Sequence, residues 1–391
     1  MSLHALVAHL DRNLYQPGVV LSQQNHFGLF EQTGIQVARV RTPQWEISSG
    51  SMVEQVRSGG VGAAMREGGQ RARLWHTLGG LRRLSRDILP VARDLRRAID
   101  RFQPDLVHLN DAVPLVRHGI IASRLSGVPV IAHPRSFVPP TSDDDRWLVP
   151  RLQGLVFISQ AVADTQLSAI SNPPRHRVIP NGVDVALFQQ EHNRNRLREE
   201  LGSDGDSLLA GVVGRIVPWK GQDIFVEAVA LLAERFPNLH GVIVGEGSQV
   251  EGAGYAARVR DLADKLGIGD RVHMLGFRPD IPQVMAGLDL LVHCSVEPEP
   301  FGRVIIEGMA AGKPVIASRE GGATEIVSDG VDGLLVPPGD PQALADAMAD
   351  LVGDSRRRKE LASSGRLTAR RFDVEHHVAA MQDFYETILS E

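Results

Sequence analysis

Short apolar runs alternate with helix-length segments along most of the chain, and this alternation restricts the fold more than any other feature of the sequence. Three such runs lie at residues 105–109, 128–132 and 155–158, and a second series begins at Leu208. Runs that are apolar throughout are typical of parallel strands covered by helices on both faces. We therefore predict an α/β protein built from Rossmann-like, doubly wound sheets.

The length of 391 residues exceeds what one hydrophobic core usually spans, so two such units are expected. A turn signature at residues 178–184 ends the first unit, and the polar segment 189–207 has the composition of a linker. In the second unit we expect strands at residues 208–213, 241–244, 272–275, 288–293, 314–317 and 333–336. Helices are expected at residues 222–235, 255–266, after Gly302 and at 375–389, the last with a wholly apolar face that must be buried.

The N-terminal part of the chain has weaker patterns. We expect a strand at residues 3–8, a loop at 9–18, a helix at 19–32, a strand at 35–40 and a loop at 41–70. From Leu84 to Phe102 apolar residues recur at spacings of three and four. This spacing predicts an amphipathic helix that Pro90 kinks or restarts.

Arginine is concentrated in one part of the chain, residues 66–101, which we call the arginine-rich region. It contains ten arginines and four acidic residues, although the net charge of the whole chain is −5. The negative total argues against general binding of nucleic acid. The region is either a solvated helix face or a surface that docks on anionic lipid or holds an anionic acceptor.

The single cysteine, Cys294, excludes a disulfide framework and a cysteine-rich metal site. The first ten residues do not resemble a signal peptide, and no apolar run reaches the length of about eighteen residues that spans a membrane. We expect a cytoplasmic protein that is soluble or at most peripheral at the inner face of the membrane.

Residues 295–310 combine an acidic, proline-broken loop with the start of a helix. A strand, a tight loop and a helix in that order place free N–H groups at one point, where an anion can bind. Glu299 precedes the helix and Glu307 lies inside it, and carboxylates accept hydrogen bonds from hydroxyl groups. Such a pocket suits a sugar nucleotide. The alternative is an exposed acidic loop that caps a helix.

Residues 214–221, Gly-Arg-Ile-Val-Pro-Trp-Lys-Gly, follow the first strand of the second unit. Arg215 and Lys220 bring two cations to the strand end, as a diphosphate requires, and the glycines allow its close approach. The spacing is not that of a P-loop, and a charged surface loop is the alternative. Gly245, in a second glycine pair, is a weaker candidate, and the Gly321-Gly322 loop follows another strand.

Polar residues follow the strands of the first unit as well. They are His108, Asn110, His133, Arg135 and Ser159. His133 is the strongest candidate, because Arg135 and a proline-rich flexible loop at 138–145 follow it. Asp143 and Asp145 formally make an Asp-x-Asp motif, but they lie far in sequence from the diphosphate loops. No pattern typical of a metal-dependent hydrolase or a Ser-His-Asp triad is present.

Together, these motifs resemble the retaining glycosyltransferases of the GT-B fold, a family that includes lipid mannosyltransferases and sucrose-phosphate synthases. The motifs that carry the resemblance are Gly-Arg-x4-Lys-Gly at 214–221, Glu-x7-Glu from Glu299 to Glu307, Pro-Asn-Gly-Val-Asp at 180–184 and Gly-Gly-x-x-Glu at 321–325. The resemblance implies two Rossmann-like domains facing across a cleft. Residues 1–187 would form the acceptor domain, 188–373 the donor domain, and the last helix, 374–391, would cross back to the first.

The resemblance also implies roles for single residues. His133, Arg215, Lys220 and Glu299 would act at the reacting groups, with Glu307 on the ribose and Glu299 on the sugar. The remaining donor contacts would be Gly18, Gly214, Gly245, Phe277, Arg278, Phe301, Gly302 and Arg303. Gly18 is the one glycine in the loop after the first expected strand, where the family commonly has a pair.

The expected reaction is transfer of a hexosyl group from a UDP- or GDP-sugar to a hydroxyl of a glycan, glycolipid or small metabolite. Retention, front-face attack and independence from metal or other cofactors are implied by the resemblance. Two alternatives stay open: a sugar-nucleotide epimerase of the same architecture, and a catalytically silent sugar-nucleotide-binding protein.

Overall fold

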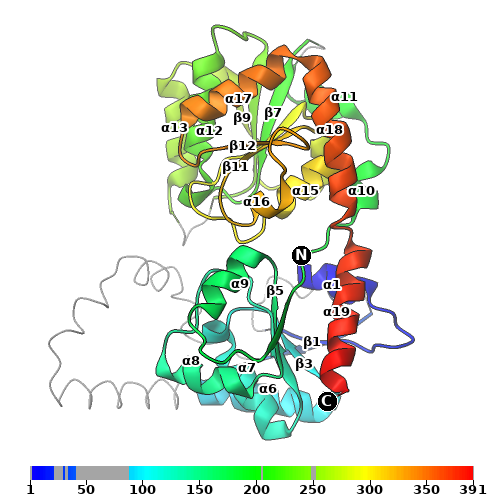
Figure 1. Ribbon diagram of the computed structural model, residues 1–391. Coiled ribbons are helices and arrows are strands. Elements are labelled where there is room, and N and C mark those ends of the chain that lie inside the picture. The colour runs from blue at the N-terminus through cyan, green and yellow to red at the C-terminus, as the bar shows by residue number, and fades with distance from the viewer. Residues whose placement is uncertain are drawn as a thin grey trace, which may run out of the picture.

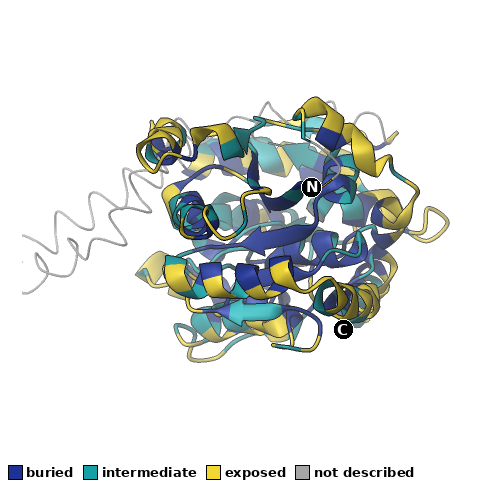
Figure 2. Ribbon diagram, turned by 90° about the horizontal axis from the view of Figure 1, so that it is seen from above, coloured by how far each residue is buried: buried dark blue, intermediate teal, exposed yellow. Residues whose placement is uncertain are grey.

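The computed structural model describes residues 2–21, 30, 34–40, 88–203, 206–247 and 252–390. These residues form two α/β bodies, and the chain passes between them just before α10 (Val185–Gln189) and again where α18 (Ser355–Arg370) leads into α19 (Val374–Leu389) (Figure 1). In both bodies buried strands lie between helices whose outer faces are exposed (Figure 2). The expected loop at 41–70 and the six arginines of the arginine-rich region that precede Ile88 lie outside the described residues.

The C-terminal body contains a parallel sheet in the order β12-β11-β10-β7-β8-β9. Its strands are β7 (Leu208–Val213), β8 (Leu239–Val244), β9 (Val272–Met274), β10 (Leu290–His293), β11 (Val315–Ser318) and β12 (Leu334–Val336). The helices are α12 (Gln222–Leu232), α13 (Tyr255–Lys265), α14 (Ile281–Gly287), α15 (Arg303–Ala310), α16 (Ala323–Ile326), α17 (Pro341–Gly353) and α18 (Ser355–Arg370), with 3-10 turns η5 (Pro218–Lys220) and η6 (Gly269–Arg271). All six predicted strands are confirmed. Their apolar runs are predictive because runs of this length can be buried on both faces only inside such a sheet.

The N-terminal body contains a four-stranded parallel sheet in the order β3-β4-β5-β6. Its strands are β3 (Val107–Leu109), β4 (Val130–Ala132), β5 (Gly154–Phe157) and β6 (Arg175–Val178), and β1 (Gly18–Leu21) pairs in parallel with β2 (Gln36–Arg39). The helices are α6 (Leu89–Phe102), α7 (Val113–Ser126), α8 (Asp143–Leu148) and α9 (Gln160–Leu167), with a 3-10 turn η4 (Val149–Arg151). Pro90 lies in the first turn of α6, where its missing N–H removes no helix hydrogen bond.

Two N-terminal predictions are wrong. Residues 3–8 form a helix, α1 (Ser2–His9), instead of a strand, and residues 18–21 form β1 instead of the start of a helix. Leu6 packs against α19, and Val19 packs in a small core with residues from α1 and β2. In such short segments tertiary packing outweighs the local pattern. Residues 22–29 and 31–33 of the expected helix lie outside the described residues.

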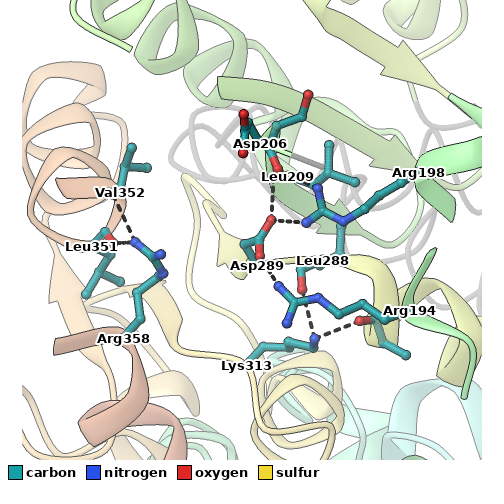
Figure 3. A network of polar contacts seen from close by, with 12 residues as sticks. Arg194, Arg198, Asp206, Leu209, Leu288, Asp289, Lys313, Leu351, Val352 and Arg358 are labelled. Atoms are coloured by element: carbon teal, nitrogen blue, oxygen red, sulfur yellow. Dashed lines mark hydrogen bonds and ion pairs between the residues drawn. The ribbon is translucent and has the colours of Figure 1, made fainter. Parts of the chain in front are cut away.

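The segment 189–207 is more ordered than a polar linker, because it contains α11 (Arg194–Glu200) after the short helix α10 (Val185–Gln189). Arg194 and Arg198 of α11 both form ion pairs with the buried Asp289, which also accepts from the Leu209 N–H at 2.9 Å (Figure 3). Lys313 donates to the carbonyls of Ala286 and Leu288, each at 2.8 Å. This network attaches α11 to the C-terminal sheet.

The last helix, α19 (Val374–Leu389), runs along the N-terminal body (Figure 1). Its apolar face carries Val378, Met381, Phe384, Tyr385 and Ile388, all buried. They share one core with Leu6, Ile131, Val156 and Ile179. The predicted apolar face of this helix is therefore buried against the first half of the chain, while the domain limit at 187/188 stays a prediction. Among the described residues, no helix is long and apolar enough to cross a membrane.

Candidate functional site

The loops after β7 and β10 meet at the carboxyl edge of the C-terminal sheet. Lys220 Nζ forms an ion pair with Glu299 Oε2, and the two side chains are only 18% and 12% exposed. The Val296 N–H donates to the Trp219 carbonyl at 2.9 Å, which joins the loops through their backbones. Gly221 has φ of +66°, and a Cβ there would lie 2.2 Å from the Cys294 carbonyl oxygen. Only glycine permits this approach.

Glu299 makes several polar contacts where the two loops meet. Besides Lys220, its Oε2 contacts His293 Nε2 at 3.2 Å and Ser295 Oγ at 3.3 Å. Burial alone would raise the pKa of Glu299, but the hydrogen bond from His293 and the charge of Lys220 outweigh it and lower the pKa to about 2. The carboxylate is therefore ionised and held in place. Sequence reasoning missed His293 and Ser295, although His293 is the last residue of a predicted strand and Ser295 follows two residues later.

Helix α15 begins directly after Gly302, whose φ is +101°, and no side chain caps its N-terminus. Phe301 is buried before it, while Arg303 Nη2 contacts Glu307 Oε1 at 3.2 Å inside the first turns. Burial raises the pKa of Glu307, and the charge of Arg303 offsets part of the rise. The two glutamates of the Glu-x7-Glu motif thus lie in different electrostatic environments.

The Gly321-Gly322 loop packs on the same junction. The Gly322 N–H donates to the Glu299 carbonyl at 2.8 Å. A Cβ on Gly322 would lie 2.5 Å from Phe301 Cα, and one on Gly321 would lie 2.4 Å from the Glu299 carbonyl oxygen. Both glycines are required for this close approach of the two backbones.

The two bodies touch at the N-terminus of α9. Ser159 Oγ donates to the Pro300 carbonyl at 2.6 Å, and the Glu325 carboxylate accepts from the N–H groups of Gln160 and Ala161, both at 2.8 Å. Anions are favoured at a helix N-terminus. The loops of the candidate donor site therefore also form the contact between the two halves of the chain.

His133 lies at the end of β4, fully buried between His108 and His377. Its Nδ1 lies 3.1 Å from His108 Nε2 and 3.2 Å from Arg135 Nη2. Burial and the charge of Arg135 lower the pKa of His133 well below its usual value, so the ring is neutral. His377, which comes from α19, is a third residue that sequence reasoning missed, because only tertiary packing brings it here.

The other predicted donor residues are placed as follows. The Gly245 N–H donates to the Gly276 carbonyl at 2.8 Å, and a Cβ on Gly245 would lie 1.9 Å from the Gly214 carbonyl oxygen, so these loops are in contact. Phe277 is 67% exposed. Arg278 instead bonds two carboxylates, those of Asp280 and Glu200. Its side chain is therefore already engaged.

Gly18 was selected because it follows the first expected strand, and that premise is wrong. The preceding element is α1, and Gly18 opens β1 beside the Phe102 ring. The Asp-x-Asp motif has a structural role: Asp145 forms a capping box with Ser142 at the start of α8 and accepts two bonds from Arg117, at 2.7 and 3.0 Å. The predicted flexible loop thus ends in an anchored helix.

Known families match both halves of the chain. The model of "Glycosyl transferases group 1" matches residues 193–368, and that of "Glycosyltransferase Family 4" matches residues 56–187. A D-inositol 3-phosphate glycosyltransferase of Saccharomonospora viridis is 31% identical over 75% of this chain and 67% of its own length. The chain belongs to the group 1 glycosyltransferases.

Solved structures of similar proteins confirm the GT-B fold. Anabaena HepE, solved with UDP and glucose, has a TM-score of 0.78 at 27% identity over 98% of this chain and 95% of that one. A sucrose-phosphate synthase from Thermosynechococcus elongatus, at 24% identity, has a TM-score of 0.67 over 78% of this chain and 79% of that one. Another relative, the D-inositol 3-phosphate glycosyltransferase of Corynebacterium urealyticum, is 32% identical over 58% of this chain and 54% of its own length. The chain spans about half the length of several such curated relatives.

Proposed function

We propose that this chain transfers a hexosyl group from a nucleoside diphosphate sugar to a hydroxyl acceptor, with retention at the anomeric carbon. The observation that carries the proposal is the Lys220–Glu299 ion pair beside the uncapped N-terminus of α15. It sets a cation, free N–H groups and an ionised carboxylate side by side, as a ligand with both phosphates and hydroxyls requires. Membership of the group 1 glycosyltransferases supports it further.

In this proposal Arg215, Lys220 and the N-terminus of α15 bind the diphosphate. Glu307 accepts from the ribose hydroxyls and Glu299 from hydroxyls of the transferred sugar. The backbone of Phe301 and Gly302 lies beside the sugar. The remaining contacts are the main chain of Gly214 and Gly245, the side chains of Phe277 and Arg303, and the main chain of Arg278, whose guanidinium is bound elsewhere.

The reaction would proceed on one face of the sugar. The bond from the anomeric carbon to the diphosphate oxygen breaks, the acceptor oxygen bonds to that carbon, and its proton passes to the leaving phosphate. Arg215, Lys220 and the helix N-terminus would stabilise the charge on the diphosphate in place of a metal ion. Activity that persists after chelation with EDTA would support this, and activity restored only by a divalent cation would contradict it.

For the donor, the complex of HepE with UDP-glucose favours a UDP-sugar, and GDP-sugars are the alternative. For the acceptor, the names of several relatives favour a phosphorylated polyol, with glycans and glycolipids as the other classes. The test is incubation with UDP- and GDP-sugars, with and without D-inositol 3-phosphate and glycolipid acceptors. Release of nucleoside diphosphate with a product of retained anomeric configuration supports the proposal. An isomerised donor without free diphosphate, or binding without release, contradicts it.

We further propose that the chain works in the cytoplasm, attached to the inner face of the membrane through the arginine-rich region. Within the described part, Arg93, Arg96, Arg97 and Arg101 lie on α6, although Arg96 and Arg97 each pair with an aspartate of the same helix. Each basic residue near an anionic surface contributes about 1 kcal/mol. Sedimentation with anionic but not neutral vesicles, lost at high salt, is expected; equal behaviour with both would contradict it.

A further inference from the structure

Basic side chains gather at the amino edge of the C-terminal sheet, the edge opposite the loops of the candidate donor site. Asp289 directly precedes β10 there and pairs with both Arg194 and Arg198, each at 2.5 Å. Lys313 lies just before β11 and donates to two backbone carbonyls, one of which belongs to Leu288, the chain neighbour of Asp289. The side chains of Arg194 and Lys313 point toward one another beside Asp289 (Figure 3).

Arg366 of α18 brings a further cation to the same place. A Cβ built on Gly312 would lie 2.2 Å from Arg366 Nε and 2.3 Å from its Nη2, so the guanidinium lies directly against the Gly312 backbone. Gly312 is the chain neighbour of Lys313, and its missing side chain leaves the room that the guanidinium fills. We refer to Arg194, Arg198, Lys313 and Arg366 as the basic cluster.

The basic cluster has an excess of positive charge. Among the described residues, Asp289 is the one carboxylate that forms an ion pair with any of its members. Burial and the charges of the three arginines lower the pKa of Lys313 to about 8, although the charge of Asp289 opposes them. All three arginines therefore lie close enough to act on one ammonium group. Four cations around one carboxylate repel one another, and a bound anion would offset this repulsion.

Three members of the basic cluster are held in place and still have N–H groups to donate. A guanidinium has five donors and an ammonium has three. Arg194 is held by Asp289, Lys313 uses two donors on carbonyls, and Arg366 has no hydrogen bond to any described residue. The Arg194 side chain is 61% exposed, Lys313 is half-buried and Arg366 is exposed, so a ligand can reach all three from solvent.

We propose that the basic cluster is a second anion site, which binds a phosphate group at the amino edge of the C-terminal sheet. Arg194, Lys313 and Arg366 donate to its oxygens, while Arg198 holds the carboxylate that orients Arg194. A phosphate group has three acceptor oxygens and about two negative charges, which suits three cationic donors. The group belongs either to inorganic phosphate or to a phosphorylated metabolite. The proposal is independent of the proposed function, because no member of the basic cluster belongs to the candidate donor site.

Lysine NMR tests the site directly, because the whole chain contains four lysines. They are Lys220 in the candidate donor site, Lys313, and the exposed Lys265 and Lys359. With 13C-labelled lysine, each Cε resonance is assigned through a single substitution to arginine. Inorganic phosphate at constant pH should shift the Lys313 resonance until it saturates and leave Lys265 and Lys359 unmoved. A Lys313 resonance that does not move, or moves equally with sodium chloride of the same ionic strength, overturns the proposal.

Arg366→Gln tests whether α18 takes part in the site. The side chain is exposed and makes no hydrogen bond to a described residue, so the fold should be retained. We expect the phosphate affinity measured at Lys313 to fall about tenfold or more, as for one lost hydrogen bond between charged groups. Arg356→Gln is the matched control, because Arg356 is exposed, bonds Glu360 at 2.8 Å and lies about 15 Å away along α18. Unchanged affinity in Arg366→Gln overturns the proposal.

The source of the phosphate group follows from a second titration, with glucose 6-phosphate. Tighter binding than that of inorganic phosphate assigns the site to a phosphorylated metabolite, and equal binding assigns it to inorganic phosphate. Lys220→Ala should leave both titrations of Lys313 unchanged. Because Lys313 can be followed in a protein without any transfer activity, failure of the proposed function and failure of this proposal are distinguishable.

Discussion

At the scale of single residues, the two glutamates of the Glu-x7-Glu motif differ in a way that their spacing does not reveal. Glu299 is ionised by contact with Lys220 and His293, whereas Glu307 is buried with Arg303 as its partner. Their pKa values shift in opposite directions. The fold therefore gains stability from one carboxylate and loses stability to the other.

Glu299 should make the fold sensitive to acid. Its pKa falls from 4.5 to about 2 on folding, so it contributes stability above about pH 4.5 that is lost as the pH falls toward 2. The shift corresponds to about 3 kcal/mol. Urea unfolding should show Glu299→Gln to be less stable than wild type at neutral pH, with the gap closing in acid. A gap that does not depend on pH, or an equal gap for the control Glu320→Gln, would contradict this.

Glu307 should show the opposite effect. Because burial raises its pKa, folding binds a proton, and stability falls as the pH rises through the interval between the ordinary and the raised value. Glu307→Gln should therefore raise the melting temperature more at alkaline than at acid pH. It should also weaken sugar-nucleotide binding about ten- to hundredfold, as expected for lost hydrogen bonds to a charged group. Unchanged binding by calorimetry would exclude Glu307 from the ribose.

At the scale of elements, glycines allow the loops of the donor site to lie backbone against backbone. Gly221 approaches the Cys294 carbonyl, Gly245 the Gly214 carbonyl, and Gly321 the Glu299 carbonyl. In each pair, the backbone of one loop packs directly against the backbone of another. These contacts join main chains, so they do not depend on side-chain rotamers.

Comparing Gly221→Ala with Gly267→Ala should distinguish two contributions to the free energy of unfolding, the close approach of two backbones and the strain of a left-handed conformation. A left-handed conformation costs an alanine about 1–2 kcal/mol, and the contact with the Cys294 carbonyl adds to it, for a total of about 3 kcal/mol or more. Gly267→Ala is the control: φ is +71° there, against +66°, but a Cβ would meet nothing within 4 Å. Gly267→Ala should therefore lower the free energy of unfolding only by the cost of the left-handed conformation, about 1–2 kcal/mol. Equal losses in urea unfolding would show that the close approach has no energetic consequence.

At the scale of the whole molecule, the two bodies are joined by α19 and by the loop contacts at the N-terminus of α9. Glu325 lies at an exposed rim, while Ser159 is buried under Pro300. An exposed carboxylate at a helix N-terminus contributes about 0.3–1 kcal/mol. A contribution of this size can shift the balance between arrangements with and without this contact, but it does not hold the two bodies in one arrangement.

Glu325→Gln should therefore shift the balance between arrangements with and without this contact about two- to fivefold toward those without it. Single-molecule energy transfer between labels on the two bodies measures this balance directly. Glu320→Gln, on the same loop before the glycine pair, is the matched control and should leave it unchanged. An unaltered distribution in Glu325→Gln would show that this contact does not contribute to closure.

Much of the architecture follows from the sequence, because runs that are apolar throughout and separated by helix lengths can be buried only in parallel sheets covered by helices. The six strands of the C-terminal sheet and the strand–loop–helix at residues 295–310 are of this kind. The N-terminal segments were predicted less well. Residues 3–8 are too short for periodicity to separate a helix from a strand, and packing against α19 decided the outcome.

The sequence by itself determined which residue types stand at the strand ends, namely Arg215, Lys220, Glu299 and His133. Only the tertiary structure decided which of these residues are in contact and which of them are charged. Lys220 and Glu299 are 79 residues apart and form an ion pair, and His133 receives its neighbours from β3 and α19. Burial, the charge of the neighbouring groups and the hydrogen-bond partners depend on such long-range contacts, which the local sequence does not specify.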